Sequence, residues 1–129
     1  MALSLFIFGE AVTDRGPTRS AFSGRPFFQR VSEVAGVAEA CQRLQESSFD
    51  VAVVDLDADG GTEVLRNIRE DSRHSHIPVV GLSRECPGPR VERLLAGGLD
   101  SVVIKPFEPS VLQNELRHIV SPAPGRADR

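Results

Sequence analysis

The chain has 129 residues, of which 40% are hydrophobic and 26% charged, and this composition is typical of one globular domain with its own hydrophobic core. Its formal net charge of -3 argues against a dedicated nucleic-acid surface, because such surfaces are usually basic. No apolar run approaches the roughly 20 residues of a membrane-spanning helix, and two cysteines, Cys41 and Cys86, are too few for a disulfide scaffold. We therefore expect a cytoplasmic protein that binds neither nucleic acid nor membranes.

Four short runs along the chain are almost continuously apolar, which is the pattern of parallel strands covered on both faces. They are Leu3–Phe8, Phe49–Val54, Ile77–Leu82 and Ser101–Ile104. A fifth candidate, Phe27–Val34, comes second in chain order and is more polar, so we expect it at an edge of the sheet.

Helical patterns lie between and after these runs. The segment Ala11–Gly24 should contain a short helix that starts near Pro17, because a glycine and a proline come early in it. Pro109 is placed for the first turn of the last helix. Four later segments repeat apolar residues at helical spacing: Val37, Cys41 and Leu44; Val64, Leu65 and Ile68; Val91, Leu94 and Leu95; and Leu112, Leu116 and Ile119.

Strands and helices thus alternate five times, which implies a parallel sheet with right-handed crossovers and helices on both faces. We predict an α/β protein with three layers, α/β/α, in the flavodoxin-like (βα)5 topology with strand order 2-1-3-4-5. The predicted domain covers residues 1–120. Residues 121–129 are rich in proline, glycine and charge, so we expect them to form a linker or a frayed end.

Polar residues mark the end of each central strand. Glu10 follows the first run, Asp55 and Asp57 follow the third, Ser83 the fourth and Lys105 the fifth. The carboxyl ends of parallel strands share one edge, and ligands bind there, so we expect the side chains of Glu10, Asp55, Ser83 and Lys105 to line one crevice. Lys105 is also the only lysine among 15 basic residues, which indicates a position where arginine does not substitute.

The chemistry of this set is coherent. Clustered carboxylates repel one another unless a cation joins them, and oxygen ligands select a hard ion such as Mg²⁺. A carboxylate can attack phosphorus and become an acyl phosphate. A metal ion and an ammonium group neutralise the transferred phosphoryl group, and a serine hydroxyl can donate a hydrogen bond to it.

Four segments resemble the response-regulator receiver family of two-component signalling. They are FDVAVVDLD around Asp55, GTEVLRNIRE after it, IPVVGLS ending at Ser83, and GGLDSVVIKPFEPSVL around Lys105. The similarity runs from Leu3 to about Val120. It implies a signalling domain rather than an enzyme, with a histidine kinase and a downstream protein as its partners.

The resemblance also implies roles at the crevice. Asp55 would accept the phosphoryl group, and Mg²⁺ would be held by Glu10, Asp55 and the backbone carbonyl of Asp57. Ser83 would move toward the phosphate, and Lys105 would pair with it and be joined to the following proline by a cis peptide bond.

A protein-binding face is implied as well, through which members of the family often form homodimers. It would consist of the helix around residues 91–95, the strand Ser101–Ile104 and the helix around residues 112–119. The sequence Pro87-Gly88-Pro89 indicates an altered start to the first of these helices.

The chain departs from the family pattern at four places. Gly9 and Glu10 stand where the family carries two acidic residues, so one metal-side carboxylate is missing. The loop after Asp55 is short and lacks the usual proline. Val102 occupies the switch position that normally holds an aromatic ring, and Arg84 stands where a small residue is customary. These departures leave open a pseudo-receiver, a protein-interaction module that signals without phosphate.

Two other functions agree less well with the sequence. The run DLDADGG resembles the start of a calcium-binding loop, but a strand precedes it and Arg66 stands at the twelfth position, where a glutamate is required. The same run resembles the first motif of haloacid-dehalogenase-type phosphatases, which need a later acidic pair, and none follows. His74 and His76 are expected at the surface, and the scattered arginines are expected to be solvated.

Overall fold

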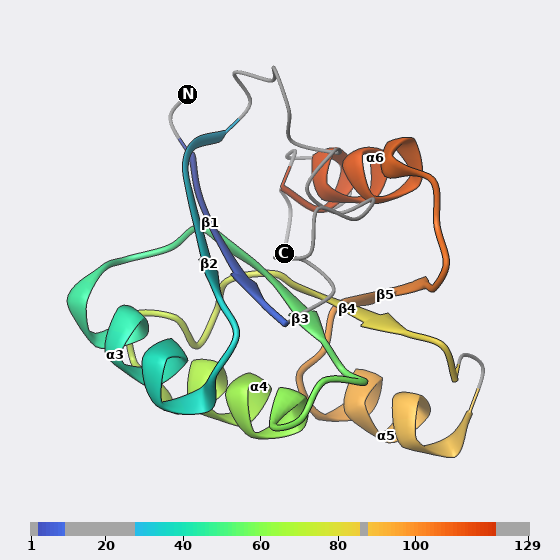
Figure 1. Ribbon diagram of the computed structural model, residues 1–129, viewed down its shortest axis with the longest axis horizontal. Helices are drawn as coiled ribbons and strands as arrows, with labels where there is room; N and C mark the ends of the chain where they lie inside the picture. Colours follow the sequence, from blue (N-terminus) through green and yellow to red (C-terminus); the bar gives the residue numbers. More distant parts are fainter. Residues whose placement is uncertain (1–2, 10–27, 86–87, 121–129) are drawn as a thin grey trace.

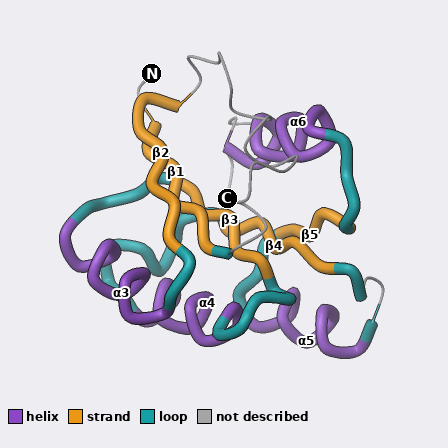
Figure 2. Tube along the Cα trace, in the orientation of Figure 1, coloured by secondary structure: helices purple, strands orange, loops and turns teal. Residues whose placement is uncertain are grey.

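The computed structural model describes residues 3–9, 28–85 and 88–120, which form a twisted sheet flanked by helices (Figures 1 and 2). In chain order the elements are β1 (Leu3–Phe8), β2 (Phe28–Val34), α3 (Val37–Glu46), β3 (Val51–Asp55), α4 (Gly61–Glu70), β4 (Val79–Ser83), α5 (Pro89–Gly97), β5 (Ser101–Ile104) and α6 (Pro109–Val120). The helix expected in Ala11–Gly24 and the tail 121–129 lie outside the described residues.

The strands form one parallel sheet in the order β2-β1-β3-β4-β5. This confirms the predicted flavodoxin-like order, including the position of the more polar strand β2 at an edge. Two observed strands begin and end slightly later than predicted, so that Asp55 and Ser83 are the last residues of β3 and β4. Their side chains therefore lie at the carboxyl edge of the sheet.

Each central strand sends alternate side chains into two separate hydrophobic cores. In β1, Phe6 and Phe8 pack with α3, α4 and α5, whereas Leu5 and Ile7 pack with α6. All four are fully buried, and each contributes about 2 kcal/mol to folding. Figure 1 shows the same layering, with α3, α4 and α5 on one face of the sheet and α6 on the other. Because both faces are covered, the strands read as continuous apolar runs.

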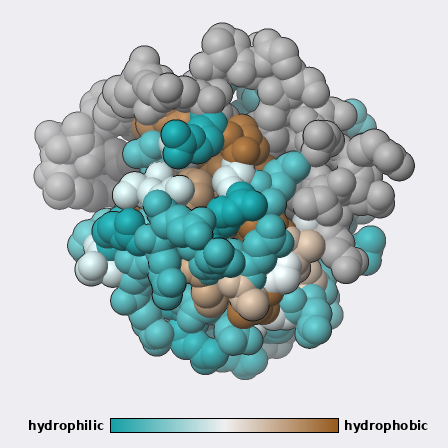
Figure 3. All heavy atoms as spheres, turned by 60° about the vertical axis from the view of Figure 1, so that its left-hand side comes forward, coloured by the Kyte–Doolittle hydropathy of each residue, from teal (hydrophilic) through white to brown (hydrophobic). Residues whose placement is uncertain are grey.

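The outer surface on the α3 side of the molecule is polar. The face that Figure 3 turns forward, which includes the α3 side of the molecule, is mostly hydrophilic, with small hydrophobic groups between polar ones. Among the residues that the structure describes, no helix is long and apolar enough to cross a membrane.

In two helices the buried residues differ from those predicted. In α3 the buried residues are Ala40 and Leu44, and Cys41 is half-buried, with its Sγ 2.9 Å from the amide nitrogen of Asn67. In α5, Leu95 is 41% exposed instead of buried. A spacing of three and four residues does not fix the rotation of a helix against its sheet to within one position.

The surface prediction for His74 is wrong, whereas His76 is exposed as expected. The His74 ring is fully buried, and its Nε2 accepts a hydrogen bond of 3.2 Å from the backbone N–H of Phe49. Its Nδ1 lies 3.2 Å from Oδ2 of Asp71. Burial raises the pKa of Asp71, but the backbone N–H of Arg73 and the His74 ring outweigh it and hold that pKa below its usual value. The His74 ring therefore connects the loop before β4 with Phe49, which precedes β3.

The prediction that the arginines are solvated is wrong for Arg69, which is 19% exposed, and it misses the backbone contacts of the more exposed Arg73. Arg73 donates to the carbonyl oxygens of Leu44 and Gln45, each at 2.7 Å. Arg69 donates to the carbonyl oxygens of Gly98 and Ile77 at 2.8 and 2.7 Å. These guanidinium groups cap the ends of helices and loops, a use that charge alone does not reveal.

Candidate functional site

The carboxyl ends of the central strands place the predicted residues together. Asp55 is the last residue of β3, Ser83 is the last of β4 and Lys105 directly follows β5. The register pairs Asp55 with Leu82 and Ser83 with Ile104, which aligns these ends across three neighbouring strands. Glu10 follows the last described residue of the β1 segment and lies outside the described residues.

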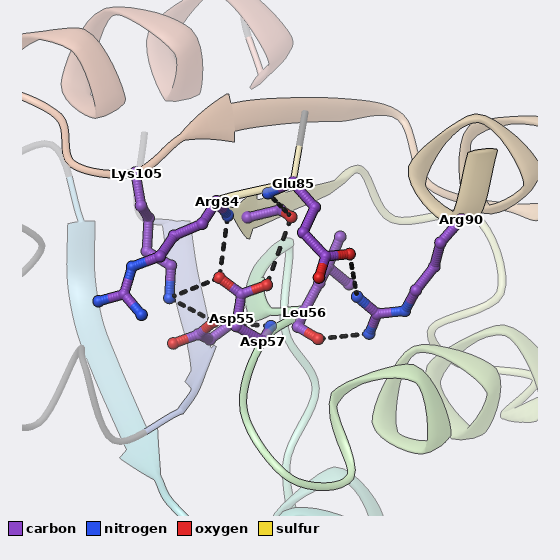
Figure 4. A network of polar contacts seen from close by, with 8 residues as sticks. Asp55, Leu56, Asp57, Arg84, Glu85, Arg90 and Lys105 are labelled. Atoms are coloured by element: carbon purple, nitrogen blue, oxygen red, sulfur yellow. Dashed lines mark hydrogen bonds and ion pairs between the residues drawn. The ribbon is translucent and has the colours of Figure 1, made fainter. Parts of the chain in front are cut away.

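Asp55 and Lys105, which are far apart in the sequence, form a buried ion pair (Figure 4). The Lys105 Nζ lies 2.9 Å from Oδ1 of Asp55, and the two side chains are only 10% and 4% exposed. The peptide bond between Lys105 and Pro106 is cis, as expected from the family resemblance. The site thus has a largely buried carboxylate whose charge is balanced by an ammonium group.

Asp57 is the residue whose role the sequence did not reveal. The family resemblance implies a role only for its backbone carbonyl, yet its side chain is turned into the site and is 20% exposed. Oδ2 lies 3.2 Å from Lys105 Nζ and accepts a hydrogen bond of 2.9 Å from the backbone N–H of Arg84. Oδ1 accepts a longer hydrogen bond of 3.4 Å from the Ser83 hydroxyl.

These contacts also decide the charge state of Asp57. Partial burial raises the pKa of Asp57. The contacts with the Arg84 N–H, the Lys105 ammonium and the Ser83 hydroxyl lower it by more, so the pKa lies below its usual value. Asp57 is therefore an anion at neutral pH, held by three donors from two strand ends.

A tight turn after β3 directs Asp57 back over the site. The Asp57 N–H donates to Oδ1 of Asp55 at 3.0 Å, and the Ala58 N–H donates to the Asp55 carbonyl at 3.2 Å. At Gly61 a Cβ atom would lie only 2.4 Å from that carbonyl oxygen, so the turn can close only over a glycine. The Asp-x-Asp spacing before Gly60 and Gly61 was the available signal for this geometry.

Gly9 makes the other close approach to Asp55. Its φ is +134°, and a Cβ atom there would lie 2.4 Å from Cβ of Asp55 and 3.3 Å from its Oδ2. The family's acidic residue at this position is therefore absent here, and there is no room for one without a backbone shift. The contact also shows that Oδ2 of Asp55 faces the end of β1, whereas Oδ1 faces Lys105.

Replacing Gly9 with alanine should lower the free energy of unfolding by about 2 kcal/mol, because the positive φ and the contact with Asp55 are both unfavourable for a Cβ atom. Urea-induced unfolding measures the change. Gly97→Ala is the matched control, since a Cβ atom there meets nothing within 4 Å and its stability should be unchanged or slightly raised. Equal effects of the two substitutions would show that the close approach at Gly9 is unimportant.

The network extends from Ser83 to helix α5. The Ser83 hydroxyl accepts a hydrogen bond of 3.0 Å from the backbone N–H of Glu85. Arg90, the second residue of α5, donates to the carbonyl of Leu56 at 2.5 Å and lies 3.9 Å from the Glu85 carboxylate. Figure 4 shows Arg90 between Glu85 and Leu56, and the Glu85 N–H contact with Ser83 links this group to the end of β4.

The remaining departures from the family pattern have defined positions. Val102 is partly buried and packs against the core that α3, α4 and α5 cover, so no aromatic ring is present to move between core and surface. The Arg84 side chain extends on the Lys105 side of the site, away from Arg90 (Figure 4). Arg84, Lys105, Asp55 and Asp57 line an open cleft of ≈ 320 Å³.

The described residues fit a Mg²⁺ ion only in part. Oδ2 of Asp55 has no hydrogen-bond partner among them and faces the end of β1, where Glu10 follows. The Asp57 carboxylate is directed to Lys105 instead, and no group of three acidic, histidine or cysteine side chains within the described ranges could hold a metal. Mg²⁺ commonly keeps several waters and uses one or two carboxylates, so a weak site remains compatible with this geometry.

Comparison with known proteins agrees with this architecture. Residues 15–117 match the family model of the response regulator receiver domain. The chemotaxis protein CheY of Pseudomonas aeruginosa is 29% identical over 94 residues, which cover 71% of this chain and 76% of that protein. The structure of the chemotaxis response regulator CheY4 of Vibrio cholerae is similar with a TM-score of 0.80 at 21% identity, covering 92% of this chain and 99% of that one.

A second solved structure resembles this chain and contains a metal ion. It is the receiver domain of the sensor histidine kinase PA1611 from Pseudomonas aeruginosa, with a magnesium ion coordinated in its active-site cleft. The TM-score is 0.68 at 19% identity, and the match covers 93% of this chain and 98% of that one. At this identity the likeness shows the shared fold.

Proposed function

Since the chain belongs to the response regulator receiver domain family, we propose that it accepts a phosphoryl group on Asp55 from a histidine kinase in the cytoplasm and thereby changes a protein-binding surface. The observation that carries the proposal is the contact of 2.9 Å between the Lys105 ammonium and the buried Asp55 carboxylate. This pair supplies a nucleophilic oxygen and, beside it, a mobile positive charge for the incoming phosphate. The receiver domain would span residues 1–120, followed by a linker or tail.

The transfer is a displacement at the phosphorus atom of the donor. A carboxylate oxygen of Asp55 attacks the phosphorus atom of the donor and forms a new O–P bond. The bond between phosphorus and the leaving group breaks, and the leaving group, a histidine nitrogen of the kinase, departs with the electron pair. Lys105 and Ser83 stabilise the oxygens of the transferred group. Mg²⁺, when bound, would neutralise part of its charge; Asp55, the carbonyl of Asp57 and Glu10 are the residues that would hold it.

The test is reaction with acetyl phosphate in the presence of Mg²⁺, followed by intact-mass measurement. The wild-type chain should gain one phosphate, which hydroxylamine should remove because it cleaves acyl phosphates. Asp55→Ala should gain none, since the nucleophile is absent. A matched control is Asp59→Ala, which removes a carboxylate from the same loop that makes no hydrogen bond or ion pair with the described residues.

Two results would contradict the proposal. One is a wild-type chain that stays unmodified after prolonged reaction. The other is an adduct of equal size in Asp55→Ala, which would place the phosphate elsewhere.

The output surface we propose is the face formed by α5, β5 and α6. Three of the large hydrophobic side chains that are exposed lie there: Leu95 at 41%, Ile104 at 51% and Val111 at 47%. Exposed apolar groups on neighbouring elements are typical of protein–protein contacts. The chain of contacts from Ser83 to Arg90 reaches this face at α5, so it offers a route by which a phosphate on Asp55 could alter partner binding or homodimer formation.

A phosphate-independent interaction module is the second candidate. It is favoured by the Asp57 carboxylate, which already accepts contacts from Lys105, Ser83 and Arg84, so that these donors have a partner without phosphate. This candidate requires that Asp55→Ala leaves partner binding intact. Loss of partner binding in a folded Asp55→Ala protein would eliminate it.

A further inference from the structure

We propose that the Asp57 carboxylate is a built-in occupant of the phosphoryl-binding site, held by the donors that would otherwise bind the phosphoryl group, and that it must leave before Asp55 is phosphorylated. The inference rests on the proposed function, because it assigns a gate to the same site. It concerns the side chain of Asp57, whereas the metal site involves only its backbone carbonyl.

Three different donors converge on the Asp57 carboxylate. One carboxylate receives an ammonium from the end of β5, a backbone N–H from the residue after β4 and a hydroxyl from the last residue of β4. A cation, a backbone amide and a hydroxyl that converge from separate segments form a set that binds anionic oxygens. Within the described residues the only anion in contact with all three is Asp57.

The Asp57 carboxylate also lies beside the oxygen of Asp55 that faces Lys105. Lys105 Nζ lies 2.9 Å from Oδ1 of Asp55 and 3.2 Å from Oδ2 of Asp57, so the ammonium bridges the two carboxylates. A phosphoryl group bonded to Asp55 on the Lys105 side would extend into the space that the Asp57 carboxylate fills. The two oxygens of Asp57 stand in for two oxygens of that phosphoryl group.

A phosphoryl group on Asp55 and the Asp57 carboxylate would repel each other. A phosphoryl group carries more than one negative charge, so at close range it and the Asp57 carboxylate repel each other, and in a protein this repulsion is weakened less than in water. The two anions therefore cannot share Lys105, Ser83 and the Arg84 N–H at the same time. Asp57 is free to leave, because it lies on an exposed turn and its side chain borders the open cleft.

The experiment measures the affinity of the full chain for beryllofluoride, a stable mimic of the phosphoryl group, in the presence of Mg²⁺. Asp57→Asn keeps the shape of the side chain and removes the charge, and Asp57→Ala removes the side chain. Both should bind beryllofluoride about tenfold more tightly than the wild type, since the competing anion is gone. Asp59→Asn, which makes the same change of charge in the same loop, should bind like the wild type.

A residue-resolved readout tests the geometry at the same time. The amide of Arg84 donates to Asp57 in the free protein, so its proton resonance should move upfield in Asp57→Ala. On addition of beryllofluoride it should return downfield, because the mimic accepts the same hydrogen bond. An Arg84 amide that does not respond to either change would overturn the assignment of the shared donor.

The outcomes separate the gate from the function. Tighter binding in both Asp57 variants but not in Asp59→Asn supports the gate. Equal binding in all four proteins overturns the gate and leaves the proposed function intact. No binding in any of them overturns the proposed function and the gate together. Equal gains in Asp57→Asn and Asp59→Asn would show a general effect of loop charge and also overturn the gate.

Discussion

Lys105→Met is expected to lower the free energy of unfolding by about 3 kcal/mol, because it leaves a buried carboxylate without its counter-ion. The ammonium contacts Asp55 at 2.9 Å and Asp57 at 3.2 Å, and the lysine side chain is only 10% exposed. Methionine retains most of the length and the apolar packing of the stem, so the lost charge dominates the effect. Urea-induced unfolding at neutral pH measures the difference.

A double-mutant cycle shows whether the loss belongs to the ion pair. Lys105→Met combined with Asp55→Asn removes both charges, so much of the lost stability should return. If the two substitutions instead add without coupling, Lys105 does not act through Asp55. The same proteins should bind beryllofluoride weakly or not at all, because each lacks a group that contacts the phosphoryl mimic.

Lys105→Arg extends the argument to the shape of the cation. The site holds a compact ammonium between two carboxylates, whereas a guanidinium is larger, planar and directs its donors in a fixed fork. We expect the arginine variant to keep its net charge but not wild-type beryllofluoride affinity. Wild-type affinity in Lys105→Arg would show that any cation suffices, and the single lysine among 15 basic residues would then need another explanation.

The fold was predictable because the central strands are buried on both faces. Leu3–Phe8 and Ser101–Ile104 were predicted with the observed bounds, because each run is apolar for most of its length. The rule that carboxyl ends share one edge predicts that Asp55, Ser83 and Lys105 lie together, and the Lys105 Nζ lies 2.9 Å from Oδ1 of Asp55. This part of the site follows from topology alone.

The side-chain contacts within the site did not follow from topology. Whether Asp57 points to solvent or back to Lys105 depends on the turn that Gly61 allows, and that turn closes through backbone contacts of a few ångström. The close approach of Gly9 to Asp55 is likewise a property of two strands packed side by side. Composition indicated a missing carboxylate at this position but not that the space for it is also missing.

Polar residues that serve the fold were the least predictable. His74 stands in a polar run of the sequence, and only the way its loop folds beneath Phe49 makes it a buried hydrogen-bond acceptor. Arg69 occupies a helix position next to apolar ones and could equally have faced solvent. Most of its partners are backbone carbonyl oxygens, which every residue possesses, so no pattern of side chains in the sequence predicts these contacts.

Arg69→Met should lower the free energy of unfolding by about 3 kcal/mol. The Arg69 guanidinium donates to the carbonyl oxygens of Gly98 and Ile77 and forms an ion pair of 2.8 Å with Asp100, which in turn accepts from the backbone N–H of Val79. The arginine side chain is 19% exposed, so its loss leaves several shielded acceptors without donors. Arg66→Met on the same helix is the control; that residue is exposed and should change stability by less than about 0.5 kcal/mol.

The position of Arg69 makes this loss separable from function. Its partners precede β4 and β5, at the amino ends of the strands, whereas Lys105 and Asp55 lie at the carboxyl ends. Arg69→Met should therefore reduce stability and leave beryllofluoride affinity unchanged under conditions where the protein remains folded, whereas Lys105→Met should reduce both. A loss of affinity in folded Arg69→Met would mean that the two edges of the sheet are coupled, and the phosphoryl site could then no longer be treated as a local arrangement of strand ends.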